Sequence, residues 1–152
     1  MISHDTTQLA SLVALKRQCL VQIRDLGVRQ LQLIDAADMT QLLKILAAKQ
    51  HLIGQVQQIE QQLEPYRAED PDRRQWATPT ARERCAAEVR DCQQLLDEIV
   101  AQERQGEALL AVRRDEVAAR LKGAHTARQA RDAYLTSGSS GTGMLDLSSG
   151  SH

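Results

Sequence analysis

Residues 31–46, LQLIDAADMTQLLKIL, decide the fold, because two leucine-rich segments lie there on either side of a short acidic stretch. Asp35-Ala36-Ala37-Asp38 separates the two segments. Asp38 and Gln41 have the spacing of a capping box, in which each side chain satisfies an unpaired backbone donor at the start of a helix. A short connection between two long helices predicts an antiparallel helical hairpin.

On both sides of this turn, apolar residues recur at steps of three and four, the spacing of one helix face. A first helix is predicted over residues 6–35, with Asp5, Thr6 and Thr7 as candidate N-caps. A second helix is predicted over residues 39–64, because the following proline would break it. The apolar positions that carry these predictions are Leu9, Leu12, Val13, Cys19, Leu20, Ile23, Leu26, Leu31, Ile34, Leu42, Ile45, Leu46, Leu52, Ile53, Val56, Ile59 and Leu63.

A third helix is predicted over residues 80–122, where apolar residues recur with a period near 3.5, the coiled-coil value. Either Thr78, with Pro79 at the first helical position, or Thr80, with Glu83 three residues later, can cap it. At roughly 60 Å it is longer than either earlier helix can cover. Gly123 is a candidate C-cap or kink, and a weaker helical piece over residues 124–135 could continue the same helix.

A change of composition after residue 135 marks the end of the predicted domain. Residues 136–143, TSGSSGTG, are typical of a flexible linker, so residues 136–152 are predicted to be a flexible Gly/Ser-rich tail. The expected fold is therefore all-α: an antiparallel three-helix bundle over residues 1–135, with coiled-coil-like long helices, followed by this C-terminal tail. A core of Leu, Ile, Val and Ala, with 2% aromatics and no Phe, suits narrow seams between helices.

Charge and hydropathy restrict the partners. The formal net charge of −1, with both signs interspersed, gives no general attraction to nucleic acid or to an anionic membrane. The basic bias of the last helical stretch is interpreted as a solvated face. No apolar stretch approaches the roughly 20 residues that span a bilayer, and the N-terminus lacks a secretory signal. We expect a cytoplasmic protein that neither inserts into a membrane nor binds nucleic acid.

No residue pattern indicates catalysis, a metal or a cofactor. Cys85 and Cys92 are seven residues apart, whereas zinc sites use a tighter pair and further ligands, so these two residues and Cys19 are interpreted as reduced core thiols. The four histidines are scattered and form no nucleophilic arrangement. The sequence therefore predicts that the protein is not an enzyme and has no cofactor; an enzymatic alternative could depend only on the three thiols.

Two apolar features have two interpretations each. Trp76 could fold back to close one end of the bundle, or it could anchor a partner. Leu145 and Leu147, at the end of a Gly/Ser tether, could dock onto the bundle, a second protomer or a partner, or they could be incidental to a disordered end.

The central region resembles the FlgN-type flagellar export chaperones. The likeness lies in Leu31-Gln-Leu-Ile34 and the acidic turn, then in Leu42-Leu43-Lys44-Ile45-Leu46 and Lys49-Gln-His-Leu52-Ile53. The long third helix and a Gly/Ser-rich tail after Ala133-Tyr134 are also similar. This resemblance implies a small cytoplasmic helical protein that binds hook-associated subunits before type III export.

The resemblance also implies that the C-terminal helix and tail bind the client. These regions hold apolar residues with no evident partner in the hairpin, and an amphipathic client helix could cover them. The predicted partner-binding residues are Val117, Leu121, Tyr134, Leu145 and Leu147. The main alternative is a structural or adaptor coiled-coil protein that forms a homodimer through its third helix.

Overall fold

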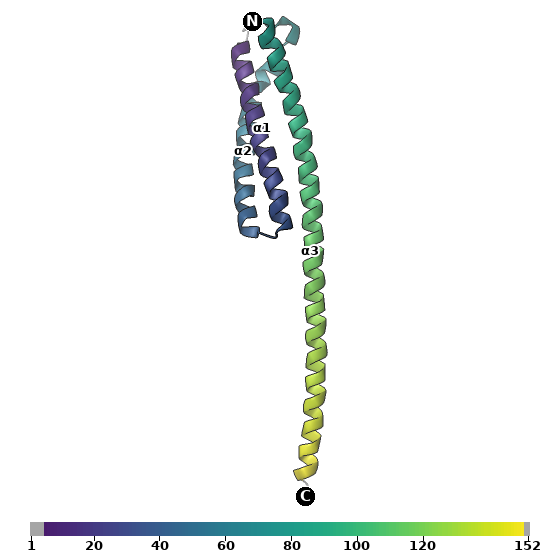
Figure 1. Cartoon of the computed structure of the whole chain (residues 1–152). Coiled ribbons are helices and arrows are strands. Elements are labelled where there is room, and N and C mark those ends of the chain that lie inside the picture. Colours follow the sequence, from purple (N-terminus) through teal and green to yellow (C-terminus); the bar gives the residue numbers. More distant parts are fainter. Residues whose placement is uncertain (1–4, 151–152) are drawn as a thin grey trace. The chain divides into compact units, whose positions relative to one another are not determined.

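Three long helices form most of the chain. The structure, a computed structural model, describes the backbone of residues 5–150 and the side chains of residues 5–137. Helix α1 spans Thr6–Asp35, α2 spans Met39–Arg67, the short 3-10 helix η1 spans Pro71–Arg73 and α3 spans Pro79–Gly150 (Figure 1). No strand occurs among residues 5–150. The predicted all-α fold with three long helices is confirmed.

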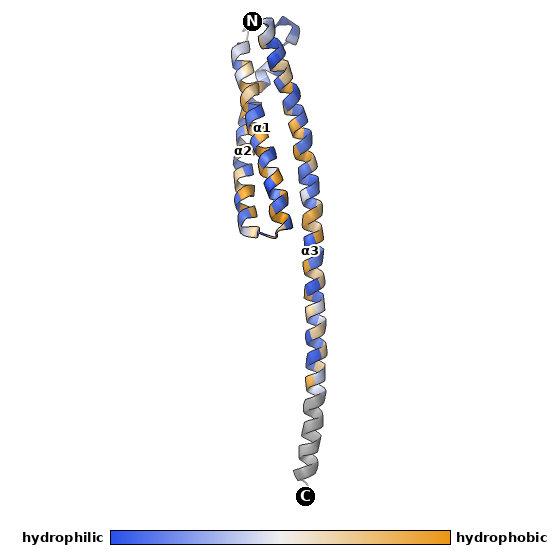
Figure 2. Cartoon of the chain, viewed as in Figure 1, coloured by the Kyte–Doolittle hydropathy of each residue, from blue (hydrophilic) through white to orange (hydrophobic). Residues whose placement is uncertain are grey.

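The chain divides into two units, residues 1–109 and residues 110–152, and α3 contributes to both. The first unit, called the bundle below, contains α1, α2, η1 and the part of α3 up to Leu109. Polar and apolar residues alternate along each of its helices (Figure 2). The bundle therefore has an inner apolar face on every helix, as the spacing of three and four requires.

Side chains outside the helices cap all three N-termini. Asp5 Oδ1 accepts a hydrogen bond from Thr7 N at 2.9 Å, and Asp38 Oδ1 accepts one from Gln41 N at 3.2 Å. Thr78 Oγ1 accepts a hydrogen bond from Ala81 N at 3.0 Å, so the arrangement with Thr78 as the cap is the one adopted. Each bond satisfies one of the backbone donors that the first turn of a helix leaves without a partner.

The turn between α1 and α2 is a Schellman motif. Asp38 N donates to Leu33 O at 3.0 Å, and Ala37 N donates to Ile34 O at 3.1 Å. Ala37 has a φ of 57°, the left-handed conformation that this motif requires and that glycine usually provides. An alanine there is strained, because its Cβ approaches the following carbonyl oxygen.

Ala37→Gly is expected to stabilise the bundle by about 1 kcal/mol, because it removes this strain. Urea denaturation followed by circular dichroism measures the change. Ala36→Gly is the matched control, since Ala36 has an ordinary φ of −75° and gains nothing from glycine. An Ala37→Gly variant that is less stable than the parent would contradict the role assigned to this turn.

Helix α2 extends three residues beyond its predicted end at residue 64. Pro65 lies inside the last turn, where it removes one hydrogen bond. Tyr66 is buried, and Arg74 Nη2 donates to Tyr66 O at 2.5 Å, so tertiary contacts stabilise the turn that the proline weakens. The lost bond is therefore tolerated at the C-terminus of a helix, although it would be costly in the middle of one.

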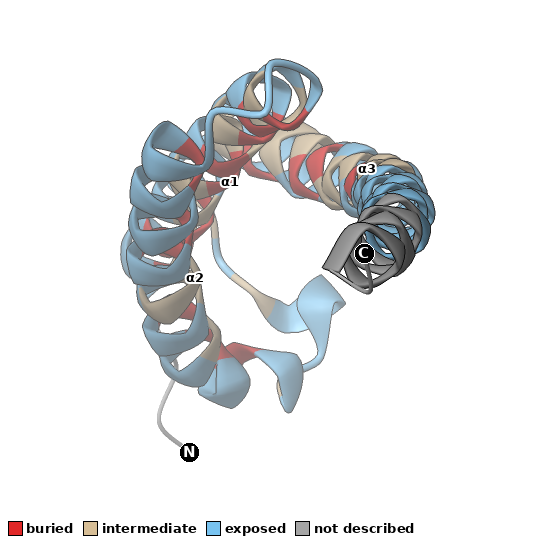
Figure 3. Ribbon diagram, turned by 90° about the horizontal axis from the view of Figure 1, so that it is seen from below, coloured by how far each residue is buried: buried red, intermediate tan, exposed pale blue. Residues whose placement is uncertain are grey.

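The core of the bundle consists of two clusters, to which all three helices contribute (Figure 3). The first lies near the start of α1, and the second lies further along it. Trp76 is half-buried and packs against the first cluster, in agreement with its interpretation as a closure of the bundle end. The first cluster contains Leu9, Leu12, Val13, Ile59, Leu63, Tyr66 and Cys85, and the second contains Leu20, Ile23, Leu52, Cys92 and Leu95.

A polar layer, with one residue from each helix, follows the second cluster. It consists of Gln30 of α1, Lys49 of α2 and Glu103 of α3. Lys49 is only 5% exposed; its Nζ donates to Gln30 Oε1 at 2.8 Å and forms an ion pair with Glu103 Oε1. Glu103 is half-exposed. A buried ammonium group needs a counter-charge and hydrogen bonds, and the other two helices supply both.

Two glycines, Gly27 of α1 and Gly106 of α3, lie at the contact between α1 and α3 beside this layer. Gln102 Nε2 donates to Arg24 O at 3.0 Å, and a Cβ on Gly27 would lie 2.1 Å from Gln102 Oε1. Any larger residue at position 27 would displace that side chain. Gly106 is buried, with the side chains of Leu31 and Ile34 about 4 Å from the position of a Cβ. The glycine that interrupts the apolar stripe of α3 is thus a contact point of the bundle.

Candidate partner-binding surface

The second unit contains one long stretch of exposed helix. Residues 110–137 of α3, called the exposed segment below, are the residues of this unit whose side chains are described. Every side chain from residue 117 to residue 137 is exposed. The segment is rich in Ala, Arg and Leu, which favour helix, and Arg113 and Glu116 form an ion pair at 3.1 Å with the spacing that stabilises a helix.

Helix α3 continues through Gly123. This glycine does not have a positive φ, so it is neither the C-cap nor the end that the sequence predicted at residue 122, and residues 124–135 continue the same helix. A single glycine between good helix formers costs about 1 kcal/mol, which does not terminate a long helix. The backbone of α3 extends to Gly150, past the predicted start of the tail at residue 136. The side chains of residues 138–152 lie outside the described part, and the flexibility of the tail stays a prediction.

Three of the five predicted partner-binding residues lie in the exposed segment. Tyr134 is 79% exposed, Leu121 is 66% exposed and Val117 is also exposed. Leu145 and Leu147 lie outside the residues whose side chains are described. The structure adds Leu110, Val112 and Leu135, which are exposed too and which the sequence-based prediction missed. For Leu110 and Leu135 the spacing was the available signal, because Leu110 lies seven residues before Val117 and Leu135 lies fourteen residues, or four turns, after Leu121.

Apolar and basic residues share one face of this segment. Counted at 3.6 residues per turn, Leu110, Val117, Leu121 and Leu135 fall within a narrow stripe. Arg128 falls on the same stripe, between Leu121 and Leu135, and Arg131 lies about 40° to one side of it. This face of the helix therefore carries basic as well as apolar side chains.

The charge of α3 changes sign along its length. Residues 79–109 carry seven carboxylates and four basic residues, whereas residues 110–137 carry three carboxylates and six basic residues. Within the exposed segment, Arg114 pairs with Asp115 at 3.5 Å, and Arg120 lies 4.0 Å from Glu116. Lys122, Arg128 and Arg131 have no ion pair within the described part of the chain.

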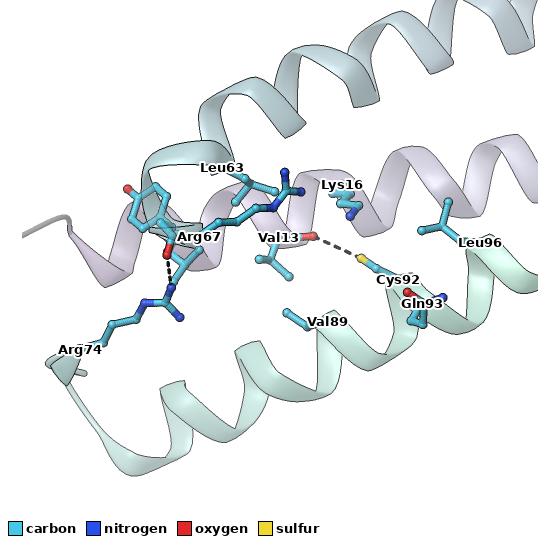
Figure 4. A pocket seen from close by; sticks show the side chains of 11 residues that line it. Val13, Lys16, Leu63, Arg67, Arg74, Val89, Cys92, Gln93 and Leu96 are labelled. Carbon is cyan, nitrogen blue, oxygen red and sulfur yellow. Dashed lines mark hydrogen bonds between the residues drawn. The ribbon is translucent and has the colours of Figure 1, made fainter. Parts of the chain in front are cut away.

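The bundle itself contains an apolar cavity of about 270 Å³ between its three helices (Figure 4). Three cations border it, and each has carboxylate partners: Lys16 lies 2.5 Å from Glu60, Arg67 pairs with Glu60 and Glu64, and Arg74 lies 3.6 Å from Glu69. The other lining residues are Leu9, Val13, Leu63, Tyr66, Val89, Cys92, Gln93 and Leu96. The three cations that border the cavity are therefore each paired with a carboxylate.

The thiols of the bundle are suited to packing. Cys92 Sγ donates to Val13 O at 3.9 Å, and burial raises the pKa of Cys92 above its ordinary value of 9.0. Burial also raises the pKa of Cys85, with a further contribution from Glu88 that Arg74 opposes. Both groups are therefore protonated near neutral pH, and a protonated thiol is a poor nucleophile. Cys19 is half-buried, and all three cysteines are free.

No group of three or more His, Cys, Asp or Glu side chains among the described residues could hold a metal ion. None of the described helices combines the length and the apolar character that crossing a lipid bilayer demands.

The resemblance to the FlgN-type export chaperones depends only on residues 31–53 and on the layout of the helices. Comparison of the chain with protein-family models, with curated proteins and with solved structures gives no match.

Proposed function

We propose that the protein is a cytoplasmic chaperone that binds a helical segment of a secreted subunit through residues 110–137. The observation that supports this most is the continuous exposure of residues 117–137 on a helix that carries Val117, Leu121, Tyr134 and Leu135. Exposed apolar residues along one helix favour the binding of a second amphipathic helix, which would bury them.

The resemblance to FlgN-type chaperones supports a narrower proposal. The client would be a hook-associated flagellar subunit, which the protein would hold in a form competent for type III export. Shielding an amphipathic client helix would prevent the client from associating with other copies of itself. Hook-associated genes beside this one in its genome would support the narrower proposal, and their absence would count against it.

A structural or adaptor role is the second candidate, because the apolar period of α3 is close to the coiled-coil value. In that case α3 would pair with a second copy. Light scattering separates the two candidates, since a permanent dimer would have twice the mass of the 152-residue chain at micromolar concentration. A monomer would exclude the adaptor that dimerises through α3.

Leu121→Ala is expected to weaken client binding about tenfold or more, since a buried leucine at a helix–helix contact contributes roughly 1.5–3 kcal/mol. Titration calorimetry with purified hook-associated subunits from the same genome measures the change. Leu43→Ala is the matched control: Leu43 of α2 is 67% exposed, almost the same fraction as Leu121, but it lies on the bundle.

Both variants should keep the helical content and the denaturation midpoint of the parent, because both leucines are exposed. Equal affinities of Leu121→Ala and the parent would remove residue 121 from the binding surface. A loss of binding in Leu43→Ala alone would move the surface to the hairpin. If no subunit binds the parent protein, the proposed client is wrong.

A further inference from the structure

We infer that the partner of the exposed segment is an acidic amphipathic helix of another protein. The inference depends on the proposed function for the location of the site and goes beyond it in naming the chemistry of the partner. Three observations carry it. Residues 110–137 hold six basic residues and only three carboxylates, and three of these cations have no ion pair among the described side chains. The third observation is the way in which the bundle pairs its own helices.

The bundle shows how α3 recognises helices by charge. Asp91 of α3 lies 3.0 Å from Arg17 of α1, and Glu98 of α3 lies 3.6 Å from Arg24 of α1. Glu103 of α3 pairs with Lys49 of α2. In residues 79–109, therefore, α3 supplies carboxylates, and the two helices that pack against it supply cations.

The exposed segment has the opposite sign. Lys122, Arg128 and Arg131 are exposed and have no ion pair within the described part of the chain. Arg128 and Arg131 share a face with Leu121 and Leu135, so a helix that covers the leucines also covers the two arginines. Desolvated cations are costly unless carboxylates meet them, so the covering helix needs Glu or Asp beside its apolar stripe.

The same charges disfavour a second copy of the chain, a nucleic acid or an anionic membrane as the partner of this face. In a pairing of exposed segment with exposed segment, two surfaces that each carry a net positive charge would meet, and like charges across an interface are unfavourable. Nucleic acid and anionic membranes prefer uninterrupted basic surfaces, whereas Asp115, Glu116 and Asp132 interrupt this one. The combination of leucines, basic residues and scattered carboxylates fits a protein helix best.

Two designed peptides test the inference on the full-length protein. Both are amphipathic helices with the same apolar stripe; one has Glu at the flanking positions and the other has Lys. We expect the acidic peptide to bind at least about tenfold more tightly than the basic one, because charge complementarity determines partner choice. Raising NaCl from about 0.05 M to about 0.3 M should weaken the binding of the acidic peptide. Fluorescence anisotropy of labelled peptides measures both effects.

A charge-reversal variant makes the test specific. Arg128→Glu/Arg131→Glu should reverse the preference, so that the basic peptide becomes the tighter ligand. Arg90→Glu/Arg104→Glu is the matched control: both residues are exposed on α3 within the bundle, and the change in net charge is the same. The control should keep the preference for the acidic peptide.

Several results would overturn the inference. Equal, salt-independent binding of the two peptides is one, and an unchanged preference in Arg128→Glu/Arg131→Glu is another. Tighter binding of an anionic phosphatidylglycerol vesicle or of a DNA duplex than of the acidic peptide would assign the segment to a different partner. A dimer in light scattering that Arg128→Glu/Arg131→Glu makes monomeric would assign the face to a second copy.

The two proposals fail separately. If the acidic peptide binds with the expected preference but no hook-associated subunit binds, the export-chaperone function is wrong and the inference stands. If a subunit binds through Leu121 but Arg128→Glu/Arg131→Glu leaves its affinity unchanged, the function stands and the acidic partner is wrong.

Discussion

Replacing Leu20 with alanine is expected to lower the free energy of unfolding of the bundle by about 3–4 kcal/mol. Leu20 is 2% exposed and is one of the two most completely buried large side chains among the described residues. It packs with Ile23 of its own helix, Leu52 of α2 and Cys92 and Leu95 of α3. Truncation therefore leaves a cavity where three helices meet, and rigid helices cannot readily collapse into it.

Urea denaturation followed by far-ultraviolet circular dichroism measures this loss. Leu15→Ala is the matched control, because Leu15 lies on the same helix but is 50% exposed. Its cost should stay below about 1 kcal/mol. Similar losses for the two variants would mean that the second cluster is not packed around Leu20.

Glu103→Ala is expected to destabilise the bundle by about 2–3 kcal/mol, an unusually large effect for a half-exposed carboxylate. The reason is that the substitution leaves the Lys49 ammonium without its counter-charge. Lys49 is buried, and without Glu103 its ammonium retains only the neutral oxygen of Gln30. The estimate lies below the full cost of breaking a buried pair, because water can reach the Glu103 side of the layer.

A double-mutant cycle separates this explanation from a loss of packing. Lys49→Met removes the charge but keeps an apolar chain of similar length, and we expect it to cost less than about 1 kcal/mol. Glu103→Ala should then be nearly neutral in the Lys49→Met background, since no buried charge remains. Lys44→Met, at an exposed position of the same helix, is the control and should have no effect. Additive losses at Lys49 and Glu103 would contradict the polar layer.

The sequence predicts the bundle well, because the spacing of apolar residues records which face of each helix is buried. Leu20, Ile34 and Leu52 were identified in this way, and all three are in the core. Two charged residues also lie within these apolar stripes, and the prediction did not place them in the core. Lys49 lies on the apolar stripe between Ile45 and Leu52, and Glu103 interrupts the stripe between Ile99 and Gly106. A lysine in an apolar stripe usually keeps its ammonium group in solvent. That Lys49 is buried becomes clear only from the structure, in which it contacts Gln30 of α1 and Glu103 of α3.

Helix ends and contacts between distant residues were less predictable. Pro65 and Gly123 are both strong local signals for a break, yet α2 ends at Arg67 and α3 passes through Gly123. The burial of Tyr66 and the hydrogen bond from the Arg74 side chain to Tyr66 O outweigh the effect of the proline. Local propensity does not include a contact with a residue nine positions further along the chain.

The candidate surface was predictable in part. The prediction selected Val117, Leu121 and Tyr134, because these apolar residues had no evident partner in the hairpin, and the structure leaves them exposed. Their role in binding stays a prediction. That Lys122, Arg128 and Arg131 form no ion pair with the described side chains was not predictable, because a charge on a helix surface finds or lacks a partner according to side-chain conformation as well as spacing.

The short Schellman turn between α1 and α2 has a consequence for the time course of synthesis. The loop that joins these helices is so short that closing it costs little entropy, so the hairpin can form as soon as residue 67 leaves the ribosome. Residues 68–109 follow over about 2–8 s at typical rates of translation. During that interval the apolar faces around Leu20 and Leu52 are not yet covered by Cys92 and Leu95 of α3. The nascent hairpin thus exposes, for a few seconds, an apolar face that the completed bundle buries.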